Sequence, residues 1–336
     1  MADVRGVCRV LVAVALLAVP ALPLNSASMQ AQPQPTQGEL QPSAGRLIAP
    51  VARQAGVLNL DAPRPRLLTS FEAPLYVADV DVSASGSLVA AVRDPNGGDL
   101  VLLDGQDGSP RPLVTRVDAS ESLGAPVWAS DGSRIVYERE DLRSAPVAFR
   151  GQAAVRYPTR VESVHADGSN REVLVDDARQ PGLSPDATTI AYVRSSARGT
   201  ALHVTVGGED RALIDDERFP DLAYPRFSPS GDRIAFAGLS STTARGHAQP
   251  TWFGWLSAAV AEAHGLPWDV WLIQADGSGL HELAGLGADD PSLAWSPDGT
   301  QLFVYGGNGA FVIDAMTGET LTYSHLAGYG AIAWVP

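Results

Sequence analysis

The sequence predicts an all-β protein, a six-bladed β-propeller whose terminal strands close the ring, with one short helical insertion. Three observations predict this fold. A strand–turn–strand unit recurs five times along the chain. Each unit continues into a third strand, a second turn and a short fourth strand, which is the four-stranded antiparallel blade of a propeller. The last residues of the chain repeat the first strand of the unit, and the residues after position 45 supply the other three strands.

Residues 1–28 have the pattern of a signal peptide. Arg5 and Arg9 precede an apolar run over residues 10–24, which small and polar residues follow. The run is shorter than the roughly 20 residues of a membrane-spanning helix, and Pro20 and Pro23 interrupt it. We therefore expect an exported protein, periplasmic or extracellular. Membrane attachment through an uncleaved segment is the alternative.

The next segment, residues 29–45, is rich in Gln and Pro and predicts a disordered linker. The only cysteine, Cys8, precedes the apolar run, whereas a lipid acceptor would follow it. We expect neither lipidation nor a disulfide in the mature chain. The propeller is then predicted over residues 46–336.

Composition restricts the classes of partner. Hydrophobic residues make up 45% of the chain and charged residues 18%, which predicts a sizeable core. The formal net charge is −14, and all the basic residues are arginines. Because such a surface repels phosphate groups, we expect no nucleic-acid binding.

The repeated unit is an apolar strand, a tight turn and a second apolar strand. Its last copy has the turn Ser296-Pro297-Asp298-Gly299-Thr300. Proline fixes the start of this turn, aspartate caps it, and glycine adopts the positive φ that it requires. The five copies span residues 80–92, 126–137, 181–193, 225–236 and 291–305. The second turns span residues 106–109, 166–169, 207–210, 275–278 and 316–319, and the fourth strands residues 112–114, 172–175, 212–214, 280–283 and 320–323.

The sixth blade is predicted to combine both ends of the chain. Residues 331–336 match residues 292–297 and predict an innermost strand. Residues 46–51, 56–61 and 64–68 predict the second, third and fourth strands of the same blade. This closure would leave no free sheet edge between the first and last blades.

The segments Ala294-Trp295-Ser296-Pro297-Asp298-Gly299-Thr300 and 269–279 resemble the repeat of the TolB-like β-propeller family, a WD-repeat-like family of periplasmic or secreted propellers. The resemblance covers nearly all of residues 46–336. It implies six blades, an extracytoplasmic location and a binding role, as in the Tol-Pal envelope system. The chain departs from TolB because a linker is predicted where TolB has a separate N-terminal domain.

Two blades carry insertions, residues 138–158 and 239–269, between their second and third strands. In an up-and-down blade these connections emerge on the same face as the connections between blades, opposite the Asp-Gly turns. We expect this face to be the functional one. The first insertion is of mixed charge and predicts a solvated loop.

The second insertion predicts a short helix from the N-cap Thr251 to Gly265. One hypothesis is that its apolar stripe packs on the propeller as a lid. The other is that exposed aromatic residues bind a protein or peptide partner. The candidate partner-binding residues are Trp252, Phe253, Trp255, Leu256 and Trp268.

Acidic residues occur in four of the connections between blades and predict an acidic face. They could cap turns and keep the protein soluble, or they could bind Ca²⁺ near the channel mouth. Without a Ca²⁺-loop motif we expect no cofactor. The acidic residues are Asp118, Glu121, Asp176, Asp177, Asp215, Asp216, Glu217, Asp221, Asp289 and Asp290.

Catalytic motifs are missing from the sequence. There is no Gly-x-Ser-x-Gly elbow, no sialidase Asp-box, no phosphate-binding loop and no histidine pair with metal-ligand spacing. We therefore expect a non-enzymatic, monomeric binding or scaffold propeller. The alternative is a metal-assisted lyase, lactonase or hydrolase that acts at the acidic channel mouth.

Overall fold

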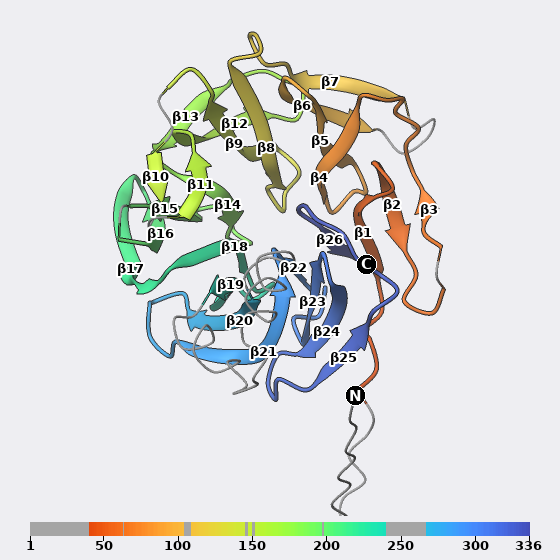
Figure 1. Cartoon of the computed structure of the whole chain (residues 1–336), viewed down its shortest axis with the longest axis vertical. Helices are drawn as coiled ribbons and strands as arrows, with labels where there is room; N and C mark the ends of the chain where they lie inside the picture. The colour runs from red at the N-terminus through yellow and green to blue at the C-terminus, as the bar shows by residue number, and fades with distance from the viewer. Residues whose placement is uncertain are drawn as a thin grey trace, which may run out of the picture. The chain divides into compact units, whose positions relative to one another are not determined.

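The computed structural model describes residues 40–62, 64–103, 109–144, 147–149, 152–196, 198–239 and 267–336. Six four-stranded antiparallel sheets are arranged as a ring around a central channel (Figure 1). This confirms the predicted all-β, six-bladed propeller. The described residues form no helix, and therefore none that could cross a membrane. The predicted helix from Thr251 to Gly265 lies outside them.

Five blades follow one another along the chain, each beginning with its innermost strand. Blade 1 comprises β4 (Tyr76–Val82), β5 (Leu88–Asp94), β6 (Gly97–Leu103) and β7 (Pro110–Val114). Blade 2 comprises β8 (Glu121–Trp128), β9 (Arg134–Asp141), β12 (Thr159–His165) and β13 (Glu172–Asp176). Blade 3 comprises β14 (Arg179–Leu183), β15 (Thr189–Ser195), β16 (Thr200–Val206) and β17 (Glu209–Phe219). Blade 4 comprises β18 (Asp221–Phe227), β19 (Arg233–Leu239), β20 (Pro267–Gln274) and β21 (His281–Asp289). Blade 5 comprises β22 (Ser292–Trp295), β23 (Gln301–Gly306), β24 (Gly309–Asp314) and β25 (Thr320–Tyr323).

Blade 6 joins the two ends of the described chain, as predicted. Its strands, from the channel outwards, are β26 (Ala333–Val335), β1 (Arg46–Val51), β2 (Gln54–Leu58) and β3 (Arg66–Leu67). Leu47 pairs with Trp334 in the antiparallel register of β1 and β26. The hydrogen-bonded sheet therefore continues across the point where the chain starts and stops.

The segment before β1 is also attached to the propeller. Leu40 is buried, and the backbone N–H of Ser43 donates to the side-chain amide oxygen of Gln301 at 2.7 Å. The Gln301 amide nitrogen in turn donates to the carbonyl of Gln41 at 2.7 Å. Residues 40–45, which the sequence assigned to the linker, thus lie against blade 5.

The tight turns have the predicted chemistry. In blade 5 the Asp298 carboxylate accepts hydrogen bonds from the Ser296 hydroxyl at 2.6 Å and the Thr300 N–H at 3.0 Å. These bonds lower the pKa of Asp298 to about 2. Gly299 takes a φ of 70°, and in blade 3 Ala187 takes 57° at the equivalent position. Ala187, which stands where the other turns have glycine, therefore keeps the turn. Its left-handed conformation is energetically unfavourable for a residue with a Cβ.

The core lies between neighbouring blades. Tryptophans at the ends of three innermost strands, Trp128, Trp295 and Trp334, are each 7–8% exposed, as expected for core residues. Trp334 packs edge-on against Phe303 of blade 5 and belongs to an apolar cluster with Leu47 and Ile332. Contacts of this kind connect each blade to the next.

The first insertion differs from the predicted solvated loop. β9 continues into it as far as Asp141, and a two-stranded hairpin follows, formed by β10 (Val147–Phe149) and β11 (Gln152–Arg156). The backbone of residues 138–158 is thus largely strand, because the inserted residues pair with one another. The middle of the second insertion, residues 240–266, lies outside the described residues.

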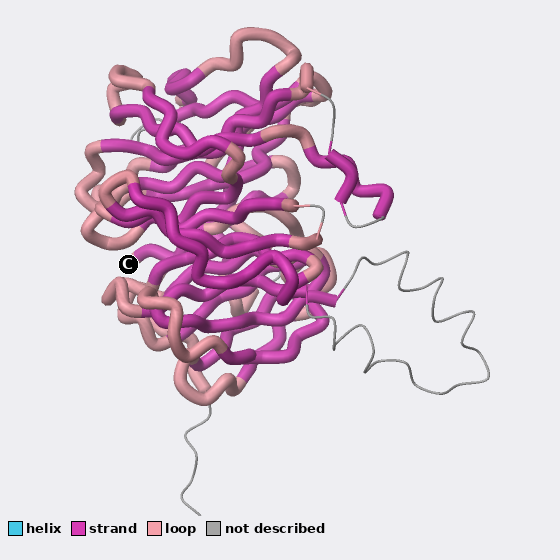
Figure 2. Tube along the Cα trace, turned by 90° about the vertical axis from the view of Figure 1, so that its left-hand side faces the viewer, coloured by secondary structure: helices cyan, strands magenta, loops and turns pink. Residues whose placement is uncertain are grey.

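The ring has two distinct faces, seen edge-on in Figure 2. We call the face with the first and second turns the turn face, and the face with the connections between blades the mouth face. The innermost strands begin at the mouth face and end at the turn face. The strands that flank the two insertions, β9 and β12 in blade 2 and β19 and β20 in blade 4, meet them at the mouth face.

Candidate functional site

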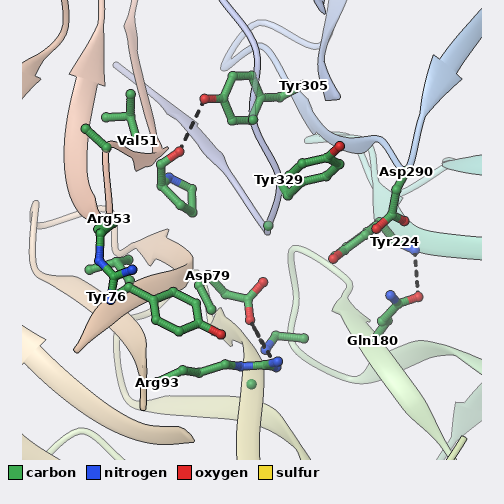
Figure 3. Close-up of a pocket in the computed structure, with 18 of the residues that line it drawn as sticks. Val51, Arg53, Tyr76, Asp79, Arg93, Gln180, Tyr224, Asp290, Tyr305 and Tyr329 are labelled. Atoms are coloured by element: carbon green, nitrogen blue, oxygen red, sulfur yellow. Dashed lines mark hydrogen bonds and ion pairs between the residues drawn. The ribbon is translucent and has the colours of Figure 1, made fainter. Parts of the chain in front are cut away.

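A cavity of about 510 Å³ opens at the mouth face of the central channel (Figure 3). We call it the mouth cavity. All six blades contribute to it, chiefly through the first residues of the innermost strands. The polar lining residues are Arg53, Tyr76, Asp79, Arg93, Glu138, Gln180, Tyr224, Asp290, Tyr305 and Tyr329.

Four residues at the edge of the mouth cavity, which we call the rim, share a left-handed backbone conformation. Ala125, Gln180, Tyr224 and Asp290 all have φ between 44° and 51°, and each directly precedes a proline. Ala125, Gln180 and Tyr224 lie where the pairing of the innermost strand with its neighbour shifts register. Left-handed conformations of this kind cost on the order of 1–3 kcal/mol each and persist only where the surroundings hold them. The rim is therefore built from repeated strained residues.

Side chains of neighbouring blades hold these rim residues. Asp79 of blade 1 accepts hydrogen bonds from the backbone N–H of Ala331 at 2.8 Å and of Ala125 at 3.2 Å. Glu138 of blade 2 accepts from the Gln180 N–H at 2.9 Å. The Gln180 amide oxygen accepts from the Tyr224 N–H at 3.3 Å. A chain of side-chain caps thus passes from blade 6 through blades 1, 2 and 3 to blade 4.

The charged groups at the rim differ in how fully they are hydrogen-bonded. Asp79 is 5% exposed, with each carboxylate oxygen bonded to a backbone N–H. The Arg93 guanidinium lies 4.0 Å from Asp79, and its buried Nε has no hydrogen-bond partner among the described residues. Burial lowers the pKa of Arg93, but the charges of Asp79 and Glu138 outweigh this effect and raise it above its usual value. Arg93 therefore stays charged, and its side chain is 37% exposed at the cavity.

Tyrosines supply aromatic surface around the cavity. Burial raises the pKa of Tyr305 to about 12, and its hydroxyl donates to a backbone carbonyl. Burial and the charge of Asp79 also raise the pKa of Tyr224. Tyr329 is 54% exposed and donates to Asp289 at 2.8 Å. These phenols stay neutral, so they offer hydrogen-bond donors and ring faces of the kind enriched at binding surfaces.

The lining of the mouth cavity combines arginine, tyrosine, glutamine and carboxylate side chains. The residues that line the described cavity include no Ser, Thr, Cys or His. Within the described ranges, no three acidic, His or Cys side chains gather as a metal site would require. The cavity offers a cation, neutral phenols and carboxylates that already cap backbone groups.

The ten acidic residues predicted from the sequence do not gather at the mouth cavity. Only Asp290 among the ten lines the mouth cavity. Glu121 is 2% exposed and paired with Arg139, and Asp221 pairs with Arg179 at 2.9 Å. The others cap turns, pair with arginine or tyrosine or face solvent, as Asp216 does in its pair with Arg198. Asp177, Asp215 and Asp216 line one pocket of blade 3 beside Arg194, and they lie away from the mouth cavity.

Of the five residues predicted to bind a partner, the structure describes only Trp268. Trp268, in β20, is 8% exposed and packs in the core between blades 4 and 5, so it offers no exposed docking surface. Trp252, Phe253, Trp255 and Leu256 lie outside the described residues, and their role stays a prediction. The strands that flank them end at Leu239 and begin again at Pro267, both at the mouth face.

Sequence reasoning missed Asp79, Arg93, Glu138 and Tyr224. A signal for the rim was nevertheless present, because a residue directly before proline recurs within or just before the innermost strand in four blades. Asp79, Arg93 and Glu138 carried no such signal. They lie on strands with ordinary alternation, and only ring closure brings them together.

No family model and no curated protein matches the sequence. Solved structures share its fold. TolB from Acinetobacter baumannii aligns with a TM-score of 0.62 at 14% identity, over 87% of this chain and 67% of that chain. A chain of a nidogen/laminin complex aligns with a TM-score of 0.60 at 13% identity, over 87% and 99%. A putative TolB from Agrobacterium tumefaciens gives 0.56 at 14% identity, over 88% and 100%.

The similar propellers also include an enzyme. An oligogalacturonate lyase from Vibrio parahaemolyticus aligns with a TM-score of 0.50 at 12% identity, over 80% of this chain and 70% of that chain. At such identities the likeness shows the fold alone, and membership of the TolB-like repeat family stays a prediction. Because one fold carries several activities, function must be argued from the site.

Proposed function

We propose that this chain is an exported, non-enzymatic binding propeller that holds a segment of a protein or peptide partner in the mouth cavity. The observation that carries the proposal is the cavity itself, to which all six blades contribute. Its volume of about 510 Å³ lies within the roughly 300–1,000 Å³ range of ligand pockets.

The polar chemistry of the rim supports a binding role. Asp79 and Glu138 already accept backbone hydrogen bonds, so they stiffen the rim. The charged side chain of Arg93 is partly exposed at the cavity, and Tyr329 presents an exposed ring. A rigid rim with aromatic and guanidinium groups suits association, because little side-chain freedom is lost when a partner binds.

Two further features agree with this proposal but rest on the sequence. The signal-peptide pattern of residues 1–28 favours export to the periplasm or cell exterior. The aromatic residues predicted to bind a partner belong to an insertion of the mouth face.

Site-specific photo-crosslinking in cells that produce the protein tests the proposal. A photoreactive phenylalanine analogue replaces Tyr329 at the mouth face, which is 54% exposed. The matched control replaces Met316, which is 83% exposed in the second turn of blade 5, on the turn face. We expect a discrete protein or peptide adduct from position 329 and none from position 316.

Equal adducts from both positions, or an adduct only from position 316, would place binding elsewhere. The enzymatic alternative makes a different prediction. If the purified protein catalyses a reaction that Asp79→Asn or Glu138→Gln abolishes while the fold is retained, the non-enzymatic assignment is wrong.

A further inference from the structure

A second cavity, of about 320 Å³, lies beside the mouth cavity between blades 2 and 3. We call it the side pocket. Its walls come from β9, the start of β12, the connection after β13, and the mouth-face ends of β14 and β15. Glu138 lines both cavities, so the two are neighbours. Its volume is at the lower end of the range for ligand pockets, a size suited to one side chain or a small molecule.

Two carboxylates of β9 face this pocket. Glu138 and Glu140 are two residues apart, and so they lie on the same side of the strand, opposite Arg139. Glu138 accepts one hydrogen bond, from the Gln180 N–H at 2.9 Å. Glu140 is partly buried, and its carboxylate has no hydrogen bond or ion pair with any residue that the structure describes.

The one arginine of the pocket wall does not neutralise these carboxylates directly. Arg179 is 9% exposed, and its guanidinium donates to the Asp221 carboxylate at 2.9 Å and to the Leu222 carbonyl at 3.1 Å. It also donates to the hydroxyl of Ser195 at 3.2 Å and the amide oxygen of Gln180 at 2.8 Å. Its charge is thus matched by Asp221, on the side of blade 4.

The two glutamates are therefore carboxylates held in a partly desolvated pocket, with no described cation at ion-pair distance; Arg179 and Arg93 act on Glu138 only from farther away. Burial raises the pKa of Glu138, and burial together with the charge of Glu138 raises the pKa of Glu140. A cation that enters the pocket would lower the pKa of both carboxylates, because opposite charge favours the ionised carboxylate.

The other wall residues favour an organic cation. Tyr157 offers an aromatic ring and a hydroxyl, and Pro158 and Val193 offer apolar surface for an aliphatic stem. Ca²⁺ would need six to eight oxygen ligands, and no three metal-ligating side chains gather among the described residues.

We propose that the side pocket binds the guanidinium or ammonium group of a basic side chain, with Glu138 and Glu140 as its acceptors. The proposal goes beyond the function of the mouth cavity, and it holds whether or not that cavity is occupied.

Titration calorimetry with two neutral-backbone probes tests the side pocket. The probes are N-acetyl-arginine amide and its uncharged isostere N-acetyl-citrulline amide. We expect saturable binding of the arginine probe, with the citrulline probe at least about tenfold weaker, because charge-assisted hydrogen bonds are lost. Glu140→Gln should weaken the arginine probe by at least about tenfold. Glu319→Gln, at an exposed turn-face position, should leave it unchanged.

Thermal melting of each variant shows whether it is folded, and Glu140→Gln should be, because it removes a carboxylate without a partner. Equal affinity for both probes, or no saturable binding, would overturn the proposal. Binding that survives Glu140→Gln would overturn it as well. Loss through Asp290→Asn alone would place the cation in the mouth cavity and refute the assignment to the side pocket.

Discussion

Deleting residues 331–336 is expected to open the ring. The deletion removes β26 and, with it, two large buried side chains: Trp334, 7% exposed, and Ile332, 4% exposed. Truncating a buried tryptophan to alanine costs about 3–5 kcal/mol and an isoleucine about 2–5 kcal/mol. The loss of roughly 5–10 kcal/mol is comparable to the total stability of a typical domain.

The assay is thermal unfolding of the full and truncated proteins, followed by circular dichroism. At about 2 °C per kcal/mol for a large domain, the melting temperature should fall by roughly 10–20 °C, or the native state should be lost. The matched control is Trp128→Ala, at the same position in blade 2, where the chain is continuous. It should cost only the single-residue amount, about 3–5 kcal/mol. A truncated protein that melts within a few degrees of the full chain, or no lower than this control, would refute the closure.

Three other substitutions probe buried polar groups, each measured by urea unfolding. Asp79→Ala should cost about 2–5 kcal/mol, because two backbone N–H groups lose their acceptor; a loss below 1 kcal/mol would contradict the capping role. Glu162→Gln should cost about 3–5 kcal/mol, because Glu162 is 1% exposed and bonded to Arg160 and Arg171; a neutral effect would show that this network contributes nothing. Burial raises the pKa of Asp81 to about 6, above its unfolded value of about 4. The protonated carboxyl therefore stabilises the fold at low pH, and this contribution is lost as the pH rises through 6. Asp81→Asn should gain up to about 3 kcal/mol relative to wild type between pH 4 and 7, whereas a difference independent of pH would argue against the shift.

The sequence predicted the blades because their signals are local. The turn around Asp298 uses residues within five positions of one another, and the same chemistry recurs in other blades. Ring closure could also be predicted, because residues 331–336 copy the first strand of a unit whose other strands follow residue 45. Local turn chemistry together with a repeat was enough to fix the architecture.

The site could not be predicted to the same extent, because its residues meet only across blades. Asp79 caps Ala331, 252 positions away in the chain, and no local pattern signals that contact. Trp268 looked like a docking residue beside an aromatic segment, yet strand alternation buries it in the core. Glu121 looked like a solvated acid, but it is the partner of Arg139. A charged residue near a strand end reveals its role only when the facing blade is known.

The hairpin in the first insertion was also not predicted from the sequence. Mixed charge suggested a solvated loop, but β10 and β11 pair with each other within the insertion. Backbone pairing satisfies the polar groups of an inserted segment whatever its side-chain charge, and so composition alone did not exclude strands.

The affinity of the crosslinked partner for the purified protein tests the central claim most directly. Tyr329→Ser at the mouth face should weaken binding by about tenfold or more, because an exposed aromatic ring at the cavity is lost. Met316→Ser at the turn face should leave the affinity unchanged. Unchanged affinity for Tyr329→Ser, together with weaker binding for Met316→Ser, would contradict binding at the mouth cavity.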